Sequence, residues 1–187
     1  MDTIFALASA PGKAGISIVR LSGPLAINVA EKLTKSKLKE KQPNLRVIYD
    51  SDNHFIDQAL ILIFRKPYSF TGENVVELHL HGSSAVVSSV IKLLGNFKGL
   101  RSAEAGEFTR CALENGKIDL AQVEGLADLI DAETDAQHKQ AARIFNGALG
   151  EKTKEWRAKL VKAGALLVAT LDFADEEVPE EVTPEVE

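Results

Sequence analysis

The chain has 187 residues, of which 45% are hydrophobic and 26% are charged, and this composition excludes a disordered polar chain. The length suffices for one good-sized hydrophobic core, or for a compact domain with an attached helical piece. The formal net charge of −5 comes from the segment 172–187, which carries eight carboxylates and no base, so residues 1–171 hold 22 basic against 19 acidic side chains. A nearly neutral body excludes the basic stripe of an autonomous nucleic-acid-binding protein, so any RNA contact would be shared with other parts.

The sequence indicates a reducing compartment. Cys111 is the single cysteine, so no intrachain disulfide can form. The opening residues 1–15 lack the basic segment and the long apolar stretch of a signal peptide, and no stretch approaches the roughly 18 apolar residues of a membrane span. We expect a cytoplasmic protein without a membrane contact.

Short strands and helices alternate through the first part of the chain. Apolar runs and turn signals predict strands at Thr3–Ala8, Ile16–Leu21, Ile56–Phe64 and Val75–His81, and helices at Pro24–Lys35, Ser84–Phe97 and Glu107–Glu114. The polar, lysine-rich connection Lys35–Asn44 is expected to be an exposed loop of variable shape. This interleaving predicts a mixed α/β domain.

The second part of the chain reads as all helical. From Asp119, which can cap the next helix, apolar residues recur at helical spacing, first at Leu120, Val123, Leu126, Leu129 and Ile130, then at Ile144, Leu149, Trp156, Leu160, Leu167 and Leu171. The acidic run that follows holds two prolines and cannot continue a helix. The overall fold class is therefore α+β, with a domain at 1–118, a helical segment at 119–173 and an acidic tail at 174–187.

The first motif, A-P-G-K-A-G-I-S-I-V-R-L-S-G at residues 10–23, is a glycine-containing turn that leads into a strand. It is not a phosphate-binding P-loop, because Leu7 stands where the first glycine of that motif belongs. Gly116-Lys117 fails the same test, so we expect no GTP hydrolysis by this chain alone. Arg20 lies at the end of the strand. It is either a structural arginine, in a salt bridge or at the surface, or a residue that binds a carboxylate through two hydrogen bonds.

The second motif, Y-S-F-T-G-E-N-V-V-E-L-H-L-H-G at residues 68–82, joins a turn to a strand of strict alternation. The alternation places Glu77, His79 and His81 on the less apolar face. Two histidines on one strand face can form half of a metal site, but no cluster at ligand spacing completes it, so we expect no metal. The alternative to a binding site is a purely structural role, in which this polar face of the sheet packs against a helix or faces solvent.

The third motif spans residues 105–134 and contains G-E-F-T-R-C-A-L-E-N-G-K-I-D. Asn115-Gly116 predicts the end of a short helix, after which Lys117 stands at a turn. From its position alone, Lys117 is a solvated turn residue. Cys111 lies among small and apolar residues without a histidine near it in sequence, which favours a packing role over a nucleophile.

These three motifs, in this order and together with the acidic D-F-A-D-E-E, resemble the N-terminal portion of the tRNA-modification GTPase family over nearly the whole chain. The resemblance implies an N-terminal domain similar to the tetrahydrofolate-binding domain of aminomethyltransferases, which also forms a homodimer. It implies folate contacts at Arg20, Glu77 and Lys117, with no catalytic residue and no metal ligand in this chain. Lys13 departs from the family's common arginine.

The resemblance further implies that the folate is 5-formyl- or 5,10-methylene-tetrahydrofolate. Together with an FAD-dependent partner protein, the full-length family member is expected to build an aminomethyl-type or carboxymethylaminomethyl group at carbon 5 of the tRNA wobble uridine. GTP, potassium and magnesium would be bound by a G domain, and a Cys-x-Gly-Lys motif would follow; the chain includes neither. Helices 119–172 would lack family partners, so Leu126, Leu129 or Leu167 are expected to be exposed.

The sequence leaves two alternatives open. A stand-alone folate enzyme of the aminomethyltransferase type shares the domain type, although a helical pair with an acidic tail is not the β-rich extra domain that such an enzyme carries. A dimerisation module with a degenerate pocket predicts a stable homodimer without folate affinity.

Overall fold

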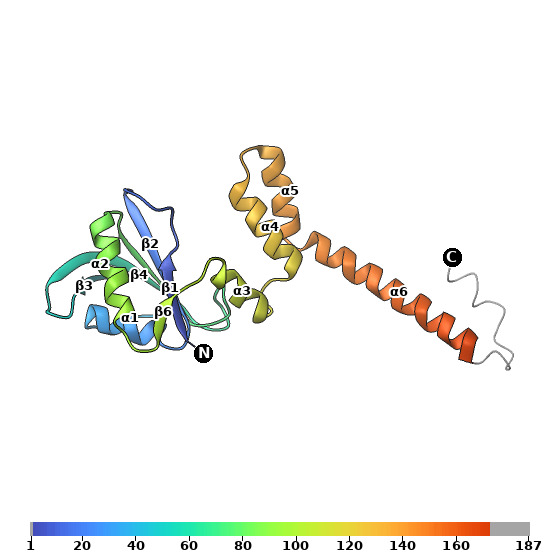
Figure 1. Ribbon diagram of the computed structural model, residues 1–187, viewed down its shortest axis with the longest axis horizontal. Helices are drawn as coiled ribbons and strands as arrows, with labels where there is room; N and C mark the ends of the chain where they lie inside the picture. Colours follow the sequence, from blue (N-terminus) through green and yellow to red (C-terminus); the bar gives the residue numbers. More distant parts are fainter. Residues whose placement is uncertain (1, 173–187) are drawn as a thin grey trace. The chain divides into compact units, whose positions relative to one another are not determined.

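The computed structural model describes residues 2–172 and divides the chain into two compact units, an N-terminal unit of residues 1–117 and a helical unit of residues 118–187 (Figure 1). The predicted acidic tail, 174–187, lies outside the described residues.

The N-terminal unit is built on a six-stranded sheet with the order β3-β4-β5-β2-β1-β6. The strands are β1 Thr3–Leu7, β2 Ile16–Ser22, β3 Asn44–Tyr49, β4 Phe55–Phe64, β5 Val75–His81 and β6 Leu100–Ser102. Neighbouring strands pair antiparallel except β1 and β6, which are parallel. The helices are α1 Ala26–Thr34, α2 Ser84–Gly95 and α3 Glu107–Glu114. The α+β class is thus confirmed.

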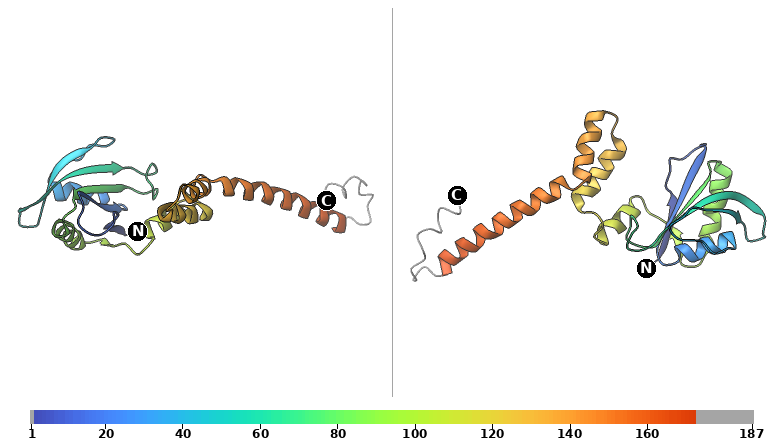
Figure 2. Two further views of the ribbon diagram at one scale, coloured as in Figure 1. Left: turned by 90° about the horizontal axis from the view of Figure 1, so that it is seen from above. Right: turned by 180° about the vertical axis from the view of Figure 1, so that it is seen from behind.

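One face of the sheet forms the hydrophobic core. The ladder aligns Phe5 with Leu21 and Leu21 with Val76, so these side chains lie in one row on the same face. Helices α1 and α2 cover this face, where Ala30 and Val90 are fully buried (Figure 2). Side chains alternate across a strand, so the residues between these core positions face the other side. That second face carries Arg20, Glu77 and His79.

The connection before β3 differs from the expected variable loop. Residues 39–43 are exposed, as predicted, but Leu38 and Asn44, the first residue of β3, are buried. The Asn44 side chain accepts a hydrogen bond from the Lys39 amide and donates one to the Lys39 carbonyl, each at 2.8 Å. A buried amide that satisfies the loop backbone fixes its shape. Strand β3 and the short strand β6 were not predicted from the sequence.

The helical unit contains α4 Leu120–Asp131, α5 Asp135–Phe145 and α6 Ala148–Asp172. Asp119 caps α4, as predicted, by accepting a hydrogen bond from the Gln122 amide, and Thr134 caps α5 in the same way. Helices α4 and α5 pack closely because Gly125 has no side chain: a Cβ there would lie 2.7 Å from the Phe145 backbone nitrogen.

The long helix α6 leaves apolar side chains open to solvent. Leu167 is 54% exposed, as expected, and Trp156 is also 54% exposed. The expectation was wrong for Leu126 and Leu129, which are half-buried. Within residues 2–172, no helix combines the length and the apolar character that crossing a membrane requires.

Candidate functional site

Arg20 and Glu77 form an ion pair on the sheet face opposite the core. The antiparallel ladder places Arg20 of β2 directly opposite Glu77 of β5. The Nε of Arg20 donates to Oε1 of Glu77 at 2.9 Å, and Nη2 lies 2.8 Å from the same oxygen. Their side chains are 29% and 16% exposed. The salt-bridge interpretation of Arg20 is therefore observed, and Oε2 of Glu77 stays outside this pair.

Two aromatic rings flank the Arg20 guanidinium. Its central carbon lies 5.9 Å from the centroid of the Phe70 ring and 5.7 Å from that of Phe108. A guanidinium near aromatic faces gains cation–π attraction, which holds it in one orientation. Phe70 comes from the loop between β4 and β5, and Phe108 from α3, so three separate chain segments meet at Arg20.

Lys117 is held by the loop that carries Phe70. Its Nζ donates to the Pro67 carbonyl at 2.9 Å, and the nearby Asn115 side chain donates to the Thr71 carbonyl at 2.7 Å. Gly72 permits this approach: its φ is +78°, and a Cβ there would lie 3.0 Å from Cβ of Asn115 and 3.2 Å from Cγ of Lys117. The second and third motifs thus dock on each other.

Helix α3 is fixed by a buried carboxylate. Glu107 is buried and accepts from Nη1 and Nη2 of Arg101 at 2.9 and 2.6 Å, and from the Glu104 amide at 2.7 Å. These hydrogen bonds, those from Arg101 first, lower the pKa of Glu107 from 4.5 to about 2. The pairing ties α3 to β6 and so positions Phe108, the next residue, beside Arg20.

His79 lies two residues after Glu77 on the same strand face. Its Nε2 is buried and has no hydrogen-bond partner among the described residues. The nearest carboxylate oxygen is Oε2 of Glu77 at 3.4 Å. His81 instead has its Nδ1 2.7 Å from Oδ1 of the buried Asp57. The two histidines thus lie beside different carboxylates.

A mainly apolar groove of about 610 Å³ opens one strand further along the sheet. It is lined by Leu62, Phe64 and Tyr68 together with residues 40–43. Leu62 pairs with Glu77 in the β4–β5 ladder, so the groove begins next to the Arg20–Glu77 pair. Tyr68 follows Pro67, the residue that accepts the hydrogen bond from Lys117.

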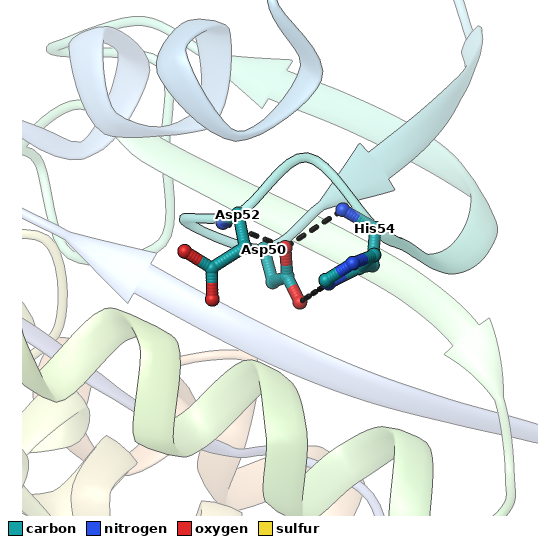
Figure 3. Close-up of side chains that lie close together, drawn as sticks. All are labelled: Asp50, Asp52 and His54. Atoms are coloured by element: carbon teal, nitrogen blue, oxygen red, sulfur yellow. Dashed lines mark hydrogen bonds and ion pairs between the residues drawn. The ribbon is translucent and has the colours of Figure 1, made fainter.

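Within residues 2–172, three potential metal ligands gather at one place, Asp50, Asp52 and His54 in the turn between β3 and β4 (Figure 3). The turn itself uses the Asp50 carboxylate, which accepts from the Asp52 and His54 amides at 2.9 and 2.8 Å and lies 3.1 Å from Nδ1 of His54. These bonds, the one from the His54 amide first, lower the pKa of Asp50. Turn formation accounts for the cluster.

Cys111 is half-buried in α3. Burial, followed by the nearby carboxylates of Glu73, Glu107 and Glu114, raises the pKa of its thiol. A raised pKa keeps the thiol protonated at neutral pH and lowers its reactivity. This environment agrees with a packing residue.

The structure brings two of the three predicted ligand contacts together. Arg20 and Glu77 form an ion pair with each other, whereas the Lys117 side chain hydrogen-bonds the loop that carries Phe70. Phe70, Phe108 and the anchor Glu107 were not predicted as site residues. The signal was present in the motifs S-F-T-G and G-E-F-T-R, whose aromatic residues stand next to the loop and helix residues that fix them.

Comparison with known families covers both units. Residues 3–117 match the family described as the GTP-binding protein TrmE N-terminus, and residues 120–187 match the MnmE helical domain. The chain belongs to the MnmE family. Its 60% identity to the tRNA modification GTPase MnmE of Roseobacter denitrificans extends over 186 residues, which are 100% of this chain and 44% of that relative.

Further MnmE relatives agree with this assignment. The tRNA modification GTPase MnmE of Cereibacter sphaeroides is 58% identical over 186 residues, and that of Parvibaculum lavamentivorans is 51% identical over 181 residues. The matches cover 100% and 96% of this chain but 43% and 41% of those relatives. The chain therefore spans less than half the length of these curated MnmE proteins.

Proposed function

We propose that residues 1–117 bind a reduced folate at the Arg20–Glu77 pair and act as the one-carbon donor site of a tRNA-modification GTPase. The observation that carries this proposal is a half-buried carboxylate held by an arginine between two phenylalanine rings. Membership of the MnmE family supports the tRNA-modification setting. All of these residues belong to the N-terminal unit of residues 1–117, so the site does not involve the helical unit of residues 118–187.

The chemistry of the site suits a pterin. The guanidine-like edge of the ring carries N–H donors, and a free carboxylate oxygen accepts a hydrogen bond from such a donor. Because Arg20 occupies Oε1 of Glu77, the oxygen Oε2 is the acceptor left for the ligand. The Arg20 guanidinium therefore acts here as the group that orients Glu77.

Lys117 is the better candidate for the glutamate tail of the folate. An ammonium group has three donors, and Lys117 uses one of them on the Pro67 carbonyl. Arg20 is already paired with a carboxylate, so a second one would have to compete with Glu77. We therefore assign tail binding to Lys117 and pterin recognition to Glu77.

In the whole protein this unit would present 5-formyl- or 5,10-methylene-tetrahydrofolate to chemistry carried out elsewhere. The proposed reaction, with an FAD-dependent partner protein, builds an aminomethyl-type or carboxymethylaminomethyl group at carbon 5 of the tRNA wobble uridine in the cytoplasm. GTP, potassium and magnesium would be bound by the part of the relatives that this chain does not span. We assign no catalytic residue to residues 1–187.

We also propose that the N-terminal unit forms a homodimer. Apolar side chains are exposed on the same sheet face as Glu77: Leu45 is 56% exposed, and Leu60 and Phe64 are each 37% exposed. Exposed apolar patches mark association surfaces. Light scattering should give twice the chain mass, and Leu45→Glu should shift the mass toward one chain. A wild-type mass of one chain at micromolar concentration would contradict the dimer.

Isothermal titration with 5-formyltetrahydrofolate tests folate binding. Glu77→Gln keeps the shape of the side chain but adds an N–H donor and removes the charge, so affinity should fall at least about tenfold. The matched control is Glu31→Gln on α1, because Glu31 is also ion-paired and its side chain is 18% exposed, against 16% for Glu77. This control should bind like the wild type.

The outcomes separate the alternatives. A folded wild-type dimer that releases no heat would favour a dimerisation module without a folate pocket. Equal binding by the wild type and Glu77→Gln would place the folate elsewhere. The stand-alone aminomethyltransferase alternative loses support from the helical-domain match over residues 120–187.

A further inference from the structure

His79 is the one residue within the described part of the chain whose side chain buries a polar atom, Nε2, without a hydrogen-bond partner. Buried polar groups in folded proteins are nearly always paired, and an exception calls for an explanation such as a missing ligand. A leucine would fill the same place without burying a polar atom, but it could not form the ion pair that a protonated His79 makes with Oε2 of Glu77 at 3.4 Å.

The surroundings of the ring show what it can reach. In the ladders, His79 pairs with Ile18 on one side and Leu60 on the other, so its neighbours in that row of the sheet face are apolar. The polar neighbour along the strand is Glu77, whose Oε2 lies 3.4 Å from Nε2 of His79. Since Arg20 occupies Oε1, the two polar atoms Oε2 and Nε2 remain side by side next to the proposed pterin position.

We propose that His79 is a further binding residue of the folate site and that its Nε2 hydrogen-bonds the pterin edge beside the group that donates to Glu77. This inference rests on the proposed folate function. A carboxylate only accepts hydrogen bonds, whereas an imidazole nitrogen with its proton donates. Together they match a heterocycle edge on which an N–H donor adjoins a carbonyl acceptor, as in the 4-oxo pterin of folates.

The pair of atoms thus predicts a ligand preference. An analogue with an amino group in place of the 4-oxo group presents a donor where His79 would also donate, and two facing donors repel. Folic acid and aminopterin differ at this position, so they form a matched ligand pair. The wild type is expected to favour the 4-oxo compound.

The test compares three proteins by isothermal titration with 5-formyltetrahydrofolate: the wild type, His79→Leu and His79→Gln. Loss of one hydrogen bond to a bound ligand predicts about tenfold weaker binding for His79→Leu, and Gln, which keeps a donor at similar reach, should restore binding to within about threefold of the wild type. Thermal melting without ligand is the structural readout. His79→Leu should melt no lower than the wild type, because it removes an unpaired buried atom.

The outcomes separate this inference from the folate function itself. If the wild type binds, Glu77→Gln loses binding and His79→Leu binds within about twofold of the wild type, the role of His79 is overturned and the folate site stands. If His79→Gln is as weak as His79→Leu and both melt lower, His79 is a structural residue and the inference is also overturned. Absence of binding by the wild type overturns both.

The ligand pair gives a readout that folding does not move. The ratio of folic acid to aminopterin affinity, measured by competition against 5-formyltetrahydrofolate, should fall by about tenfold in His79→Leu and recover in His79→Gln. An unchanged ratio in His79→Leu would contradict donation from Nε2 to the 4-oxo group.

Discussion

Arg20 approaches Glu77 through two nitrogens that share one carboxylate oxygen, Nε at 2.9 Å and Nη2 at 2.8 Å. This arrangement fixes the plane of the guanidinium and leaves the second carboxylate oxygen toward His79. The ion pair is half-buried, and Phe70 and Phe108 lie beside its arginine. It joins β2 to β5, and in the proposed folate site it orients the Glu77 carboxylate.

Arg20→Lys tests the orienting role. A lysine keeps the positive charge but cannot offer two N–H groups in one plane or lie flat against the phenylalanine rings. We expect folate affinity to fall about tenfold while the free energy of unfolding changes by less than about 1 kcal/mol, since the pair is partly exposed. Titration and urea denaturation measure the two quantities.

The control for this variant is Arg65→Lys, which changes an arginine of the same unit whose partner is Glu40. It should leave folate affinity unchanged. Equal affinities of Arg20→Lys and the wild type would show that the guanidinium geometry does not matter for binding.

Glu107→Gln tests the anchor of α3. Only Glu107 of this pair is buried, since the Arg101 side chain is 44% exposed, so weakening its hydrogen bonds should make unfolding easier by about 1–2 kcal/mol. Folate affinity should also fall, because Phe108 loses its fixed position beside Arg20. Urea denaturation followed by circular dichroism measures the stability. A variant as stable as the wild type would contradict the anchoring role.

Glu107 also predicts an acid dependence of stability. Its folded pKa is about 2, below the ordinary 4.5, so the unfolded state takes up the proton at higher pH than the folded state. The stabilising contribution is complete above pH 4.5 and is lost as the pH falls toward 2. Between these values the wild type should lose more stability than Glu107→Gln. Parallel curves for the two proteins would contradict this assignment.

Gly72→Ala tests the docking of the Phe70 loop on the segment around Lys117. The φ of +78° disfavours alanine, and the new Cβ would lie 3.0 Å from Cβ of Asn115. We expect a loss of about 1–3 kcal/mol in stability together with weaker folate binding. Gly95→Ala, where a Cβ meets nothing within 4 Å, is the matched control and should not weaken binding.

Gly125→Ala tests the packing of α4 on α5. The added Cβ would meet the backbone nitrogen of Phe145 at 2.7 Å, so the two helices would have to separate. Amide hydrogen exchange in α4 and α5 should accelerate, with a loss of about 2 kcal/mol. Gly164→Ala in α6, where nothing lies within 4 Å, should leave that exchange unchanged. Folate binding should persist in both variants.

Local sequence patterns predicted those parts of the fold that local interactions determine. The alternation in β5 set the two sheet faces, and Glu77 and His79 indeed share the face opposite the core. The cap at Asp119 followed from its own side chain and the position of Gln122. Such features need only the spacing of neighbouring residues along the chain.

The parts of the fold and of the site that were not predicted from the sequence depend on contacts between segments that are distant along the chain. The three-residue β6 is too short for any alternation, and its pairing with β1 supplies Arg101 to Glu107. From sequence, Glu107 was an ordinary acidic residue in the first turn of a helix. Phe70 and Phe108 lie 38 positions apart and meet only through Arg20. The spacing of residues along the chain therefore could not predict that these two rings lie beside Arg20.

The most direct test of the folate site is a crystal structure of the chain with 5-formyltetrahydrofolate. The proposal predicts the pterin edge within hydrogen-bond distance of Oε2 of Glu77 and of Nε2 of His79, and the glutamate tail toward Lys117. A folate bound elsewhere, with the Arg20–Glu77 pair unchanged and solvent at Oε2, would contradict it.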